Sequence, residues 1–178
     1  VYSKPYGITK IEDRYGNILI EYYPKQKEIL SEETAFIMTN LMQTVIDRGT
    51  GGSVRWKYNF YHPAAGKTGT TQGWTDAWFV GFSTQIAAGA WFGVDDPQVS
   101  LGKGADGTRA ALPAWARFMK TAHDSLYYSK EKFQQPEKVQ TFSICQVSKE
   151  KPTPLCPLEK ELFILGTDPS RLCKIHRR

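Results

Sequence analysis

The stretch from Ala64 to Val94 restricts the fold of this chain more than any other part of the sequence. It contains three short segments that predict β-strands, at about Ala64–Thr70, Ala77–Phe82 and Ile86–Val94, and the last two are rich in apolar and aromatic residues. Only three residues separate the last two runs, so these strands should pair antiparallel. We therefore expect an α+β fold in which an antiparallel sheet is flanked by helices.

Two helices are expected around this sheet. The first has Ser31 as its N-cap, acidic residues in its first turn, and Gly49 at its end. Its predicted apolar face consists of Ala35, Met38, Leu41, Met42 and Val45. The second runs to about His123 and admits Pro113 only in its first turn or at a kink. Its predicted apolar face consists of Trp115, Phe118 and Met119.

The two ends of the chain differ from this middle part. Ile8–Glu12 and Ile18–Tyr22 alternate polar and apolar residues on either side of a turn, which is typical of a β-hairpin. Residues 128–160 are rich in Lys, Glu, Gln and Pro, and we expect only weak order beyond them, at Glu161–Leu165. Two units are predicted, residues 1–126 and a basic C-terminal extension, residues 127–178.

The composition is that of a globular protein, since 40% of the 178 residues are hydrophobic and 13% are aromatic. No apolar run reaches the roughly 18 residues of a membrane span, and no signal peptide is recognised. Because the chain opens at Val1 within a continuing segment, we expect a longer parent protein with its anchor upstream. Residues 130–178 carry 10 basic and 6 acidic side chains, but no nucleic-acid-binding motif accompanies them, so no nucleic acid partner is expected.

The candidate site is the sequence G-K-T-G-T-T at residues 66–71. A phosphate-binding P-loop would need a glycine where Tyr61 stands and a helix where an aromatic strand follows, so a phosphate site is not expected. Acyl transfer at a strand edge fits better. Lys67 supplies a positive charge, and Thr68 and Thr70 share one face of the strand because side chains alternate. Gly69 lets a ligand backbone approach closely, and an exposed strand edge can bind an extended peptide.

Longer stretches carry a family resemblance. The sequence A-G-K-T-G-T-T-Q-G-W-T-D-A-W-F-V-G-F resembles the third motif of penicillin-binding proteins, especially the bifunctional class A enzymes. Four other segments also resemble this family. Y-G-I-T-K-I-E-D-R-Y-G-N-I-L resembles its upstream hairpin, and V-I-D-R-G-T-G resembles the end of a helix before the third motif. F-G-V-D-D-P resembles its last strand, and T-R-A-A-L-P-A-W-A-R-F-M resembles its C-terminal helix. The resemblance covers about residues 1–125.

This resemblance implies part of a serine transpeptidase (β-lactamase-like) domain and peptidoglycan D,D-transpeptidation on D-Ala-D-Ala stem peptides. Lys67 is then the catalytic lysine, and the substrate-binding residues are Thr68, Gly69, Thr70 and Thr71. The Thr70 N–H is implied as an oxyanion-hole donor. No cofactor or metal is implied. The implied partners are stem peptides, lipid-linked precursors and β-lactams, at the extracytoplasmic face of a bacterial membrane, with a glycosyltransferase module far upstream.

Two further motifs of the family, S-x-x-K and S-x-N, are not expected in this chain. We expect the nucleophilic serine and its lysine upstream of Val1, so the fragment alone should be inactive. A D,D-carboxypeptidase or serine β-lactamase relative stays open as an alternative, as does a non-catalytic peptide-binding module.

Several other polar residues are expected to be structural: Asp76, His62, Asp95 and Asp96. Trp74 either lines the groove or covers the strand. The cysteines leave three alternatives open. Cys145 and Cys156 could pair as a disulfide and leave Cys173 over, all three could bind zinc together with His176, or the thiols could be free.

Overall fold

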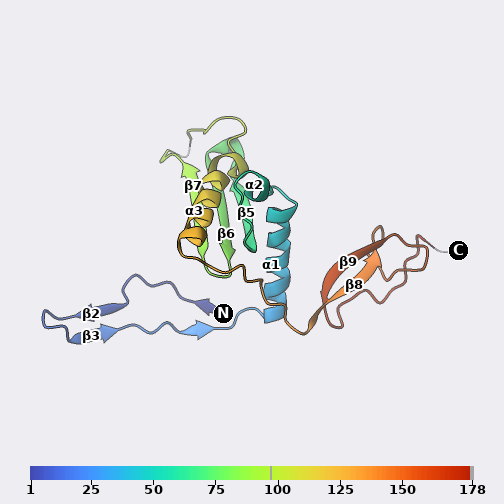
Figure 1. Ribbon diagram of the computed structural model, residues 1–178, viewed down its shortest axis with the longest axis horizontal. Coiled ribbons are helices and arrows are strands. Elements are labelled where there is room, and N and C mark those ends of the chain that lie inside the picture. The colour runs from blue at the N-terminus through green and yellow to red at the C-terminus, as the bar shows by residue number, and fades with distance from the viewer. Residues whose placement is uncertain (97, 177–178) are drawn as a thin grey trace.

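A three-stranded antiparallel sheet forms the centre of the computed structural model, which describes residues 1–96 and 98–176 (Figure 1). Its strands are β5 (Ala64–Thr70), β6 (Asp76–Ser83) and β7 (Ala87–Gly93), in that order across the sheet. Lys67 lies opposite Val80. The three strands and the antiparallel pairing of the last two confirm the sequence prediction.

The predicted start of the first helix and the predicted place of Pro113 are confirmed. The Ser31 hydroxyl accepts a hydrogen bond from the Thr34 N–H at 3.3 Å, and Pro113 lies in the first turn of its helix. The elements are α1 (Glu32–Asp47), α2 (Ser53–Trp56), the 3-10 turn η1 (Gln72–Trp74), the π-helical turn η2 (Gly107–Ala111) and α3 (Leu112–Ser125). These caps satisfy backbone groups that would otherwise lack partners.

The predicted apolar faces of the helices are only partly buried. Met38 and Leu41 of α1 are exposed, and so is Phe118 of α3, whereas Ile46 is the fully buried residue of α1. Trp115 and Met119 are buried as predicted. Helical spacing identifies which residues share a face, but the part of that face that becomes covered depends on the neighbouring elements.

The core lies between the sheet and the helices. It consists of Ile46, Val54, Phe60, Ala64, Phe79, Ala111, Leu112, Trp115, Ala116 and Met119. The Trp115 indole N–H donates to the Ala88 carbonyl at 3.0 Å, and its ring lies 4.7 Å from that of Phe79. Gly81 permits this approach, because a Cβ there would lie 2.7 Å from the indole.

Two buried histidines pack beside this core. The ring of His62 lies 4.5 Å from that of His123 and 5.5 Å from that of Phe60. Burial, followed by the charge of His123, lowers the pKa of His62. Its Nδ1 atom has no hydrogen-bond partner in the described part of the chain. His62 therefore has a structural position, as expected, in apolar surroundings that leave one of its ring nitrogens without a hydrogen bond.

The lowered pKa of His62 predicts a loss of stability in mild acid. Below about pH 6.5, the unfolded chain binds a proton at His62 more readily than the folded chain does. The free energy of unfolding should therefore fall as the pH drops from about 6.5 towards the folded pKa. In His62→Phe, which keeps an aromatic ring against Phe60, the fall between pH 7.5 and 5.5 should be smaller than in the wild type. Urea unfolding at both pH values measures this, and equal losses in the two proteins would contradict it.

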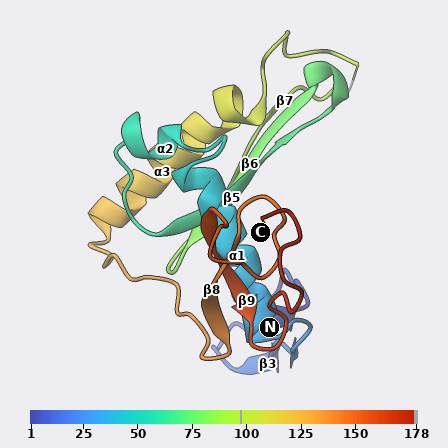
Figure 2. The ribbon, with the colours of Figure 1, turned by 90° about the vertical axis from the view of Figure 1, so that its right-hand side faces the viewer.

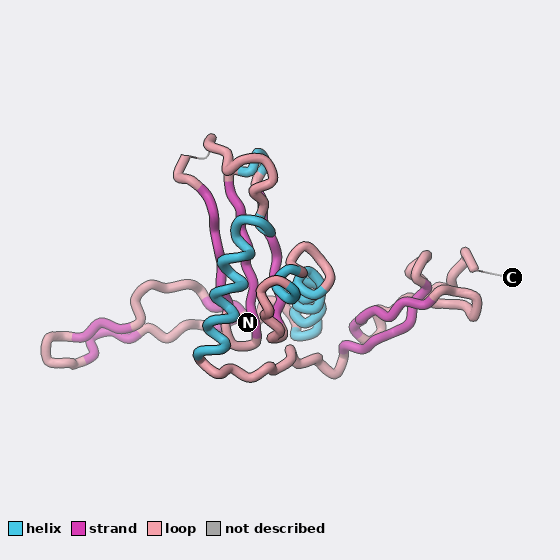
Figure 3. Tube along the Cα trace, turned by 45° about the horizontal axis from the view of Figure 1, so that its top comes forward, coloured by secondary structure: helices cyan, strands magenta, loops and turns pink. Residues whose placement is uncertain are grey.

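Short strand pairs extend from both sides of the central sheet (Figure 1). On the N-terminal side, β2 (Lys10–Glu12) pairs with β3 (Ile18–Glu21), which confirms the predicted hairpin, and β1 (Tyr2–Ser3) pairs with β4 (Gln26–Lys27). Figure 3 shows these strands apart from those of the sheet. Among the described residues, no helix is long and apolar enough for a membrane span.

The C-terminal extension is more ordered than the sequence predicted. Strands β8 (Val139–Cys145) and β9 (Leu158–Ile164) form an antiparallel hairpin that lies against α1 (Figure 2). The expectation of weak order at Glu161–Leu165 alone was wrong. The segment V-Q-T-F-S-I-C has no strict alternation to mark it, because the buried Val139 and Ile144 lie five positions apart and therefore on opposite faces of β8.

Candidate functional site

The candidate site follows the outer edge of β5. Within the described residues, β5 pairs with β6 on one side and with no strand on the other. The Thr71 N–H donates to the Asp76 carbonyl at 3.1 Å, which makes these two a hydrogen-bonded pair. In an antiparallel ladder the pairs alternate, so the backbone N–H and C=O groups of Thr68 and Thr70 point away from β6. The edge therefore offers free backbone donors at the two threonines.

Lys67 reaches the same edge. Its side chain is exposed, and its Nζ atom donates to the Thr68 carbonyl at 2.9 Å and to the Thr68 hydroxyl at 3.2 Å. Because that carbonyl points outward, these bonds bring the ammonium group around the strand to its open side. A cation, a hydroxyl and outward backbone N–H groups together can bind an anionic oxygen or a polarised carbonyl.

The end of β5 is fixed by a residue far away in the sequence. The Gly107 N–H donates to the Thr70 hydroxyl at 3.1 Å, across 37 positions of the chain. A Cβ at Gly107 would lie 2.3 Å from the Trp78 carbonyl and 2.8 Å from the Gly69 carbonyl. Only glycine fits this contact without a shift of the backbone. No local sequence pattern marks Gly107, which lies in the turn η2.

Thr71 lies beyond the end of β5, in the turn that leads to β6. Its hydroxyl is 2.7 Å from the Thr75 hydroxyl and accepts the Asp76 N–H at 2.8 Å. Thr71 is expected to be a substrate-binding residue, and in the structure its hydroxyl also bonds within this turn. Thr71 therefore differs from Thr68, whose hydroxyl lies beside the ammonium group of Lys67.

The carboxylate of Asp76 has structural contacts. One oxygen accepts the Trp91 indole N–H at 2.9 Å, and the other accepts the Thr75 hydroxyl at 3.1 Å. These bonds join the β5–β6 turn to β7. They agree with the structural role expected of Asp76.

The Gly/Asp-rich loop after β7 is held by its own hydrogen bonds and by the β5–β6 turn. Asp96 accepts the Gln98 N–H at 2.9 Å through its carboxylate, as a loop residue does. Trp74 has a positive φ of 55°, and its carbonyl accepts the Leu101 N–H at 2.7 Å. Trp74 therefore helps to join this loop to the turn after β5.

The expectation that no serine has a lysine three positions on was wrong. The sequence contains three such pairs: Ser100 and Lys103, Ser129 and Lys132, and Ser148 and Lys151. None of these pairs lies on a helix in the part of the chain that the structure describes. A serine and a lysine three positions apart become neighbours on a helix. None of the three therefore has the helical setting of an S-x-x-K nucleophile.

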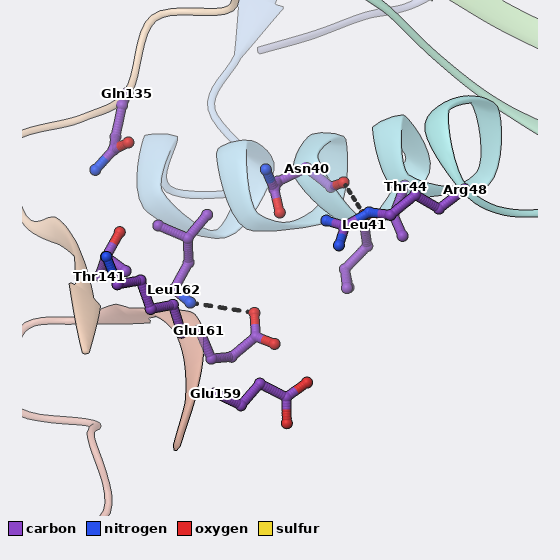
Figure 4. Close-up of a pocket in the computed structure, with 10 residues that line it drawn as sticks. Asn40, Leu41, Thr44, Arg48, Gln135, Thr141, Glu159, Glu161 and Leu162 are labelled. Carbon is purple, nitrogen blue, oxygen red and sulfur yellow. Dashed lines mark hydrogen bonds between the residues drawn. The ribbon is translucent and has the colours of Figure 1, made fainter. Parts of the chain in front are cut away.

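A groove of about 790 Å³ lies between α1 and the β8–β9 hairpin (Figure 4). Its lining residues are Asn40, Leu41, Thr44, Arg48, Gln135, Thr141, Glu159, Lys160, Glu161 and Leu162. None of them belongs to β5. Figure 4 shows side chains of both charges around it, the basic Arg48 and the acidic Glu159 and Glu161. The groove is therefore separate from the candidate site.

The cysteines do not form the disulfide that was the first alternative. No disulfide bond is present among the described residues, so the structure does not show the alternative in which Cys145 pairs with Cys156. Instead, Cys145, Cys156, Cys173 and His176 come together, and their ligand atoms all lie within 4.8 Å of one another. This cluster belongs to the C-terminal hairpin and not to the edge of β5.

Two family models match the chain. The penicillin-binding protein transpeptidase domain matches residues 1–119, and the C-terminal domain of penicillin-binding protein 1A matches residues 135–178. The crystal structure of penicillin-binding protein 1A from Haemophilus influenzae superposes with a TM-score of 0.80 at 27% sequence identity. That superposition covers 96% of this chain and 30% of the Haemophilus chain.

Curated relatives agree with these matches. Penicillin-binding protein 1A of Aquifex aeolicus is 35% identical over 170 residues, and that of Clostridium tetani is 33% identical over 180 residues. The alignments cover 96% and 98% of this chain but 23% and 22% of those relatives, so the chain spans about a quarter of their length. The chain belongs to the penicillin-binding proteins, and it carries the C-terminal part of the transpeptidase domain followed by a C-terminal domain of the 1A type.

Proposed function

We propose that this chain is the part of a class A penicillin-binding protein that binds the stem peptide for D,D-transpeptidation. The observation that carries the proposal is the open edge of β5, where the Lys67 ammonium group lies 3.2 Å from the Thr68 hydroxyl and the Thr70 N–H points outward. An extended peptide can add to this edge through backbone hydrogen bonds. The family match to the transpeptidase domain supports the same reading.

Each residue of the motif has a proposed role. The positive charge of Lys67 orients the hydroxyl groups around it for the reaction and attracts the terminal carboxylate of the peptide. Thr68 and Thr70 bind that carboxylate, and the Thr70 N–H supplies one of the two donors of an oxyanion hole. Gly69 leaves room for the peptide backbone. Thr71 contributes by holding the turn after β5 in place, since its hydroxyl bonds to that turn.

The reaction proceeds in two acyl transfers. A serine hydroxyl attacks the carbonyl between the two D-Ala residues, loses its proton to a base and forms an ester, while the terminal D-Ala leaves as the amine. An amine of a neighbouring stem peptide then attacks the ester, releases the serine and forms the new peptide bond. β-Lactams acylate the same serine.

We place the nucleophilic serine outside these 178 residues, because no serine on a helix has the required lysine among the described ones. The isolated chain is therefore inactive. The site faces the extracytoplasmic side of the bacterial membrane, and the parent protein carries the anchor and the glycosyltransferase module. The boundary between the transpeptidase part and the extension lies near residue 126.

Labelling with a fluorescent penicillin tests this proposal. The full-length parent protein should gain one covalent adduct, measured by intact mass, and the 178-residue chain should gain none. Absence of labelling in a folded parent with excess drug would overturn the proposal and favour a non-catalytic peptide-binding module. Labelling of the 178-residue chain would place the nucleophile within it, contrary to the assignment above.

A further inference from the structure

The cysteine and histidine side chains of the extension converge from three separate segments. Cys145 ends β8, Cys156 lies just before β9, and Cys173 and His176 lie in the segment that follows the hairpin. The C-terminal segment is held against the hairpin loop by two backbone bonds. The Lys151 N–H donates to the Arg171 carbonyl at 2.9 Å, and the Cys173 N–H donates to the Lys151 carbonyl at 2.8 Å. Backbone hydrogen bonds therefore hold these three segments, and with them the four side chains, close together.

Three distances within the cluster match those of a tetrahedral zinc site, and the Cys156 sulfur lies within 4.8 Å of the other three ligand atoms. The Sγ atoms of Cys145 and Cys173 are 3.6 Å apart. The His176 Nδ1 atom lies 3.4 Å from the Cys145 sulfur and 3.5 Å from the Cys173 sulfur. With Zn–S bonds of about 2.3 Å and Zn–N bonds of about 2.0 Å, tetrahedral angles place two sulfurs about 3.8 Å apart and a sulfur and a nitrogen about 3.5 Å apart.

Backbone and side-chain donors surround the sulfur atoms. The Ser148 N–H points at the Cys145 sulfur at 3.5 Å, and the Thr153 N–H points at the Cys156 sulfur at 3.3 Å. Such donors stabilise thiolates, which are the form that binds a metal, and they orient the ligands. Cys145 and Cys173 are fully buried, so a metal ion among them would be shielded from solvent.

The extension has little else to hold it together. Among the described residues, the central hydrophobic core contains none beyond Met119, and the buried side chains of the extension are Val139, Ile144, Cys145 and Cys173. The matching family domain spans only residues 135–178. Units of about 40 residues rarely fold on a hydrophobic core alone and usually need a disulfide or a metal. No disulfide is present among the described residues.

We propose that the C-terminal extension contains a structural zinc site. In this site one Zn²⁺ is bound by three thiolates and one imidazole nitrogen, from Cys145, Cys156, Cys173 and His176. The three thiols release their protons to solvent on binding. Four protein ligands leave no open position for a substrate, so the metal joins the hairpin to the C-terminal segment and takes no part in acyl transfer. The +2 charge of the ion and three thiolates give the site a net charge of −1, which the basic extension offsets.

Metal analysis of the complete 178-residue chain, purified under reducing conditions without chelator, tests the proposal. We expect about one zinc per chain by mass spectrometry of the elements, and thiolate-to-cobalt absorption after exchange with Co²⁺. Cys173→Ser and His176→Ala should lose the metal. His176→Cys should keep it, because a fourth thiolate also binds zinc. Ser143→Ala, an exposed position on β8, is the matched control and should bind as the wild type does.

Amide hydrogen exchange separates a structural metal from an adventitious one. Removing the zinc with a chelator should raise the exchange rate of the β8 and β9 amides and leave those of β5 and β6 protected. A chain with three reduced thiols that takes up no zinc would overturn the proposal. So would a chain that loses its zinc without any change in the exchange of β8 and β9, since the metal would then hold nothing together.

Discussion

Replacing Lys67 by alanine in the full-length parent protein should slow acylation by a fluorescent penicillin by about a hundredfold or more. Removal of one preorganised electrostatic group from an acyl-transfer site costs about 10²- to 10³-fold in rate. Lys67 is exposed, and its ammonium group bonds only to Thr68 in the described structure. The loss of rate should therefore come without a comparable loss of stability. The second-order rate constant of labelling and the urea midpoint measure the two effects.

Two further variants sharpen this experiment. Lys67→Arg keeps the charge but changes its shape, so it should retain more activity than alanine and less than the wild type. Lys10→Ala removes a lysine from the β2–β3 hairpin, away from the sheet (Figure 1), and should label at the wild-type rate. If Lys67→Ala labels at the wild-type rate, Lys67 has no role in acylation. That result would contradict the role proposed for Lys67 but not the proposal that the parent protein is a transpeptidase.

The parts of the fold that were predictable depend on local patterns. The strand at Ala64–Thr70, the cap at Ser31 and the place of Pro113 all follow from residues within a few positions of each other. The motif lysine and the two threonines were predictable in the same way, since alternation alone places Thr68 and Thr70 on one face.

The parts that were not predictable depend on contacts between distant residues. Gly107 bonds to Thr70 across 37 positions, and no local pattern marks it. The cluster that includes Cys145 and His176 spans 31 positions and requires the unexpected strand β8 to bring its ligands together. Spacing left zinc and a disulfide as alternatives, and only the positions of the sulfur atoms favour a metal site.

Replacing Trp115 by alanine should have the largest effect on stability, a loss of about 3–5 kcal/mol in the free energy of unfolding. Its side chain is only 1% exposed and lies against the rings of Phe79 and Phe60. Removal of the indole leaves a large cavity in the core between α3 and the sheet. It also leaves the Ala88 carbonyl without the indole N–H that it accepts at 3.0 Å.

Phe118→Ala provides the matched control, because Phe118 lies on the same helix but is 54% exposed, and its loss should cost less than about 1 kcal/mol. Urea unfolding followed by circular dichroism measures both variants, and equal losses would contradict the placement of the core. Trp115 also packs over Gly81 of β6, and β6 positions β5 through the pairing of Lys67 with Val80. A destabilised Trp115→Ala parent should therefore label more slowly at temperatures where it is still folded, whereas Phe118→Ala should label normally. This difference would connect the packing of α3 to the geometry of the edge that binds the peptide.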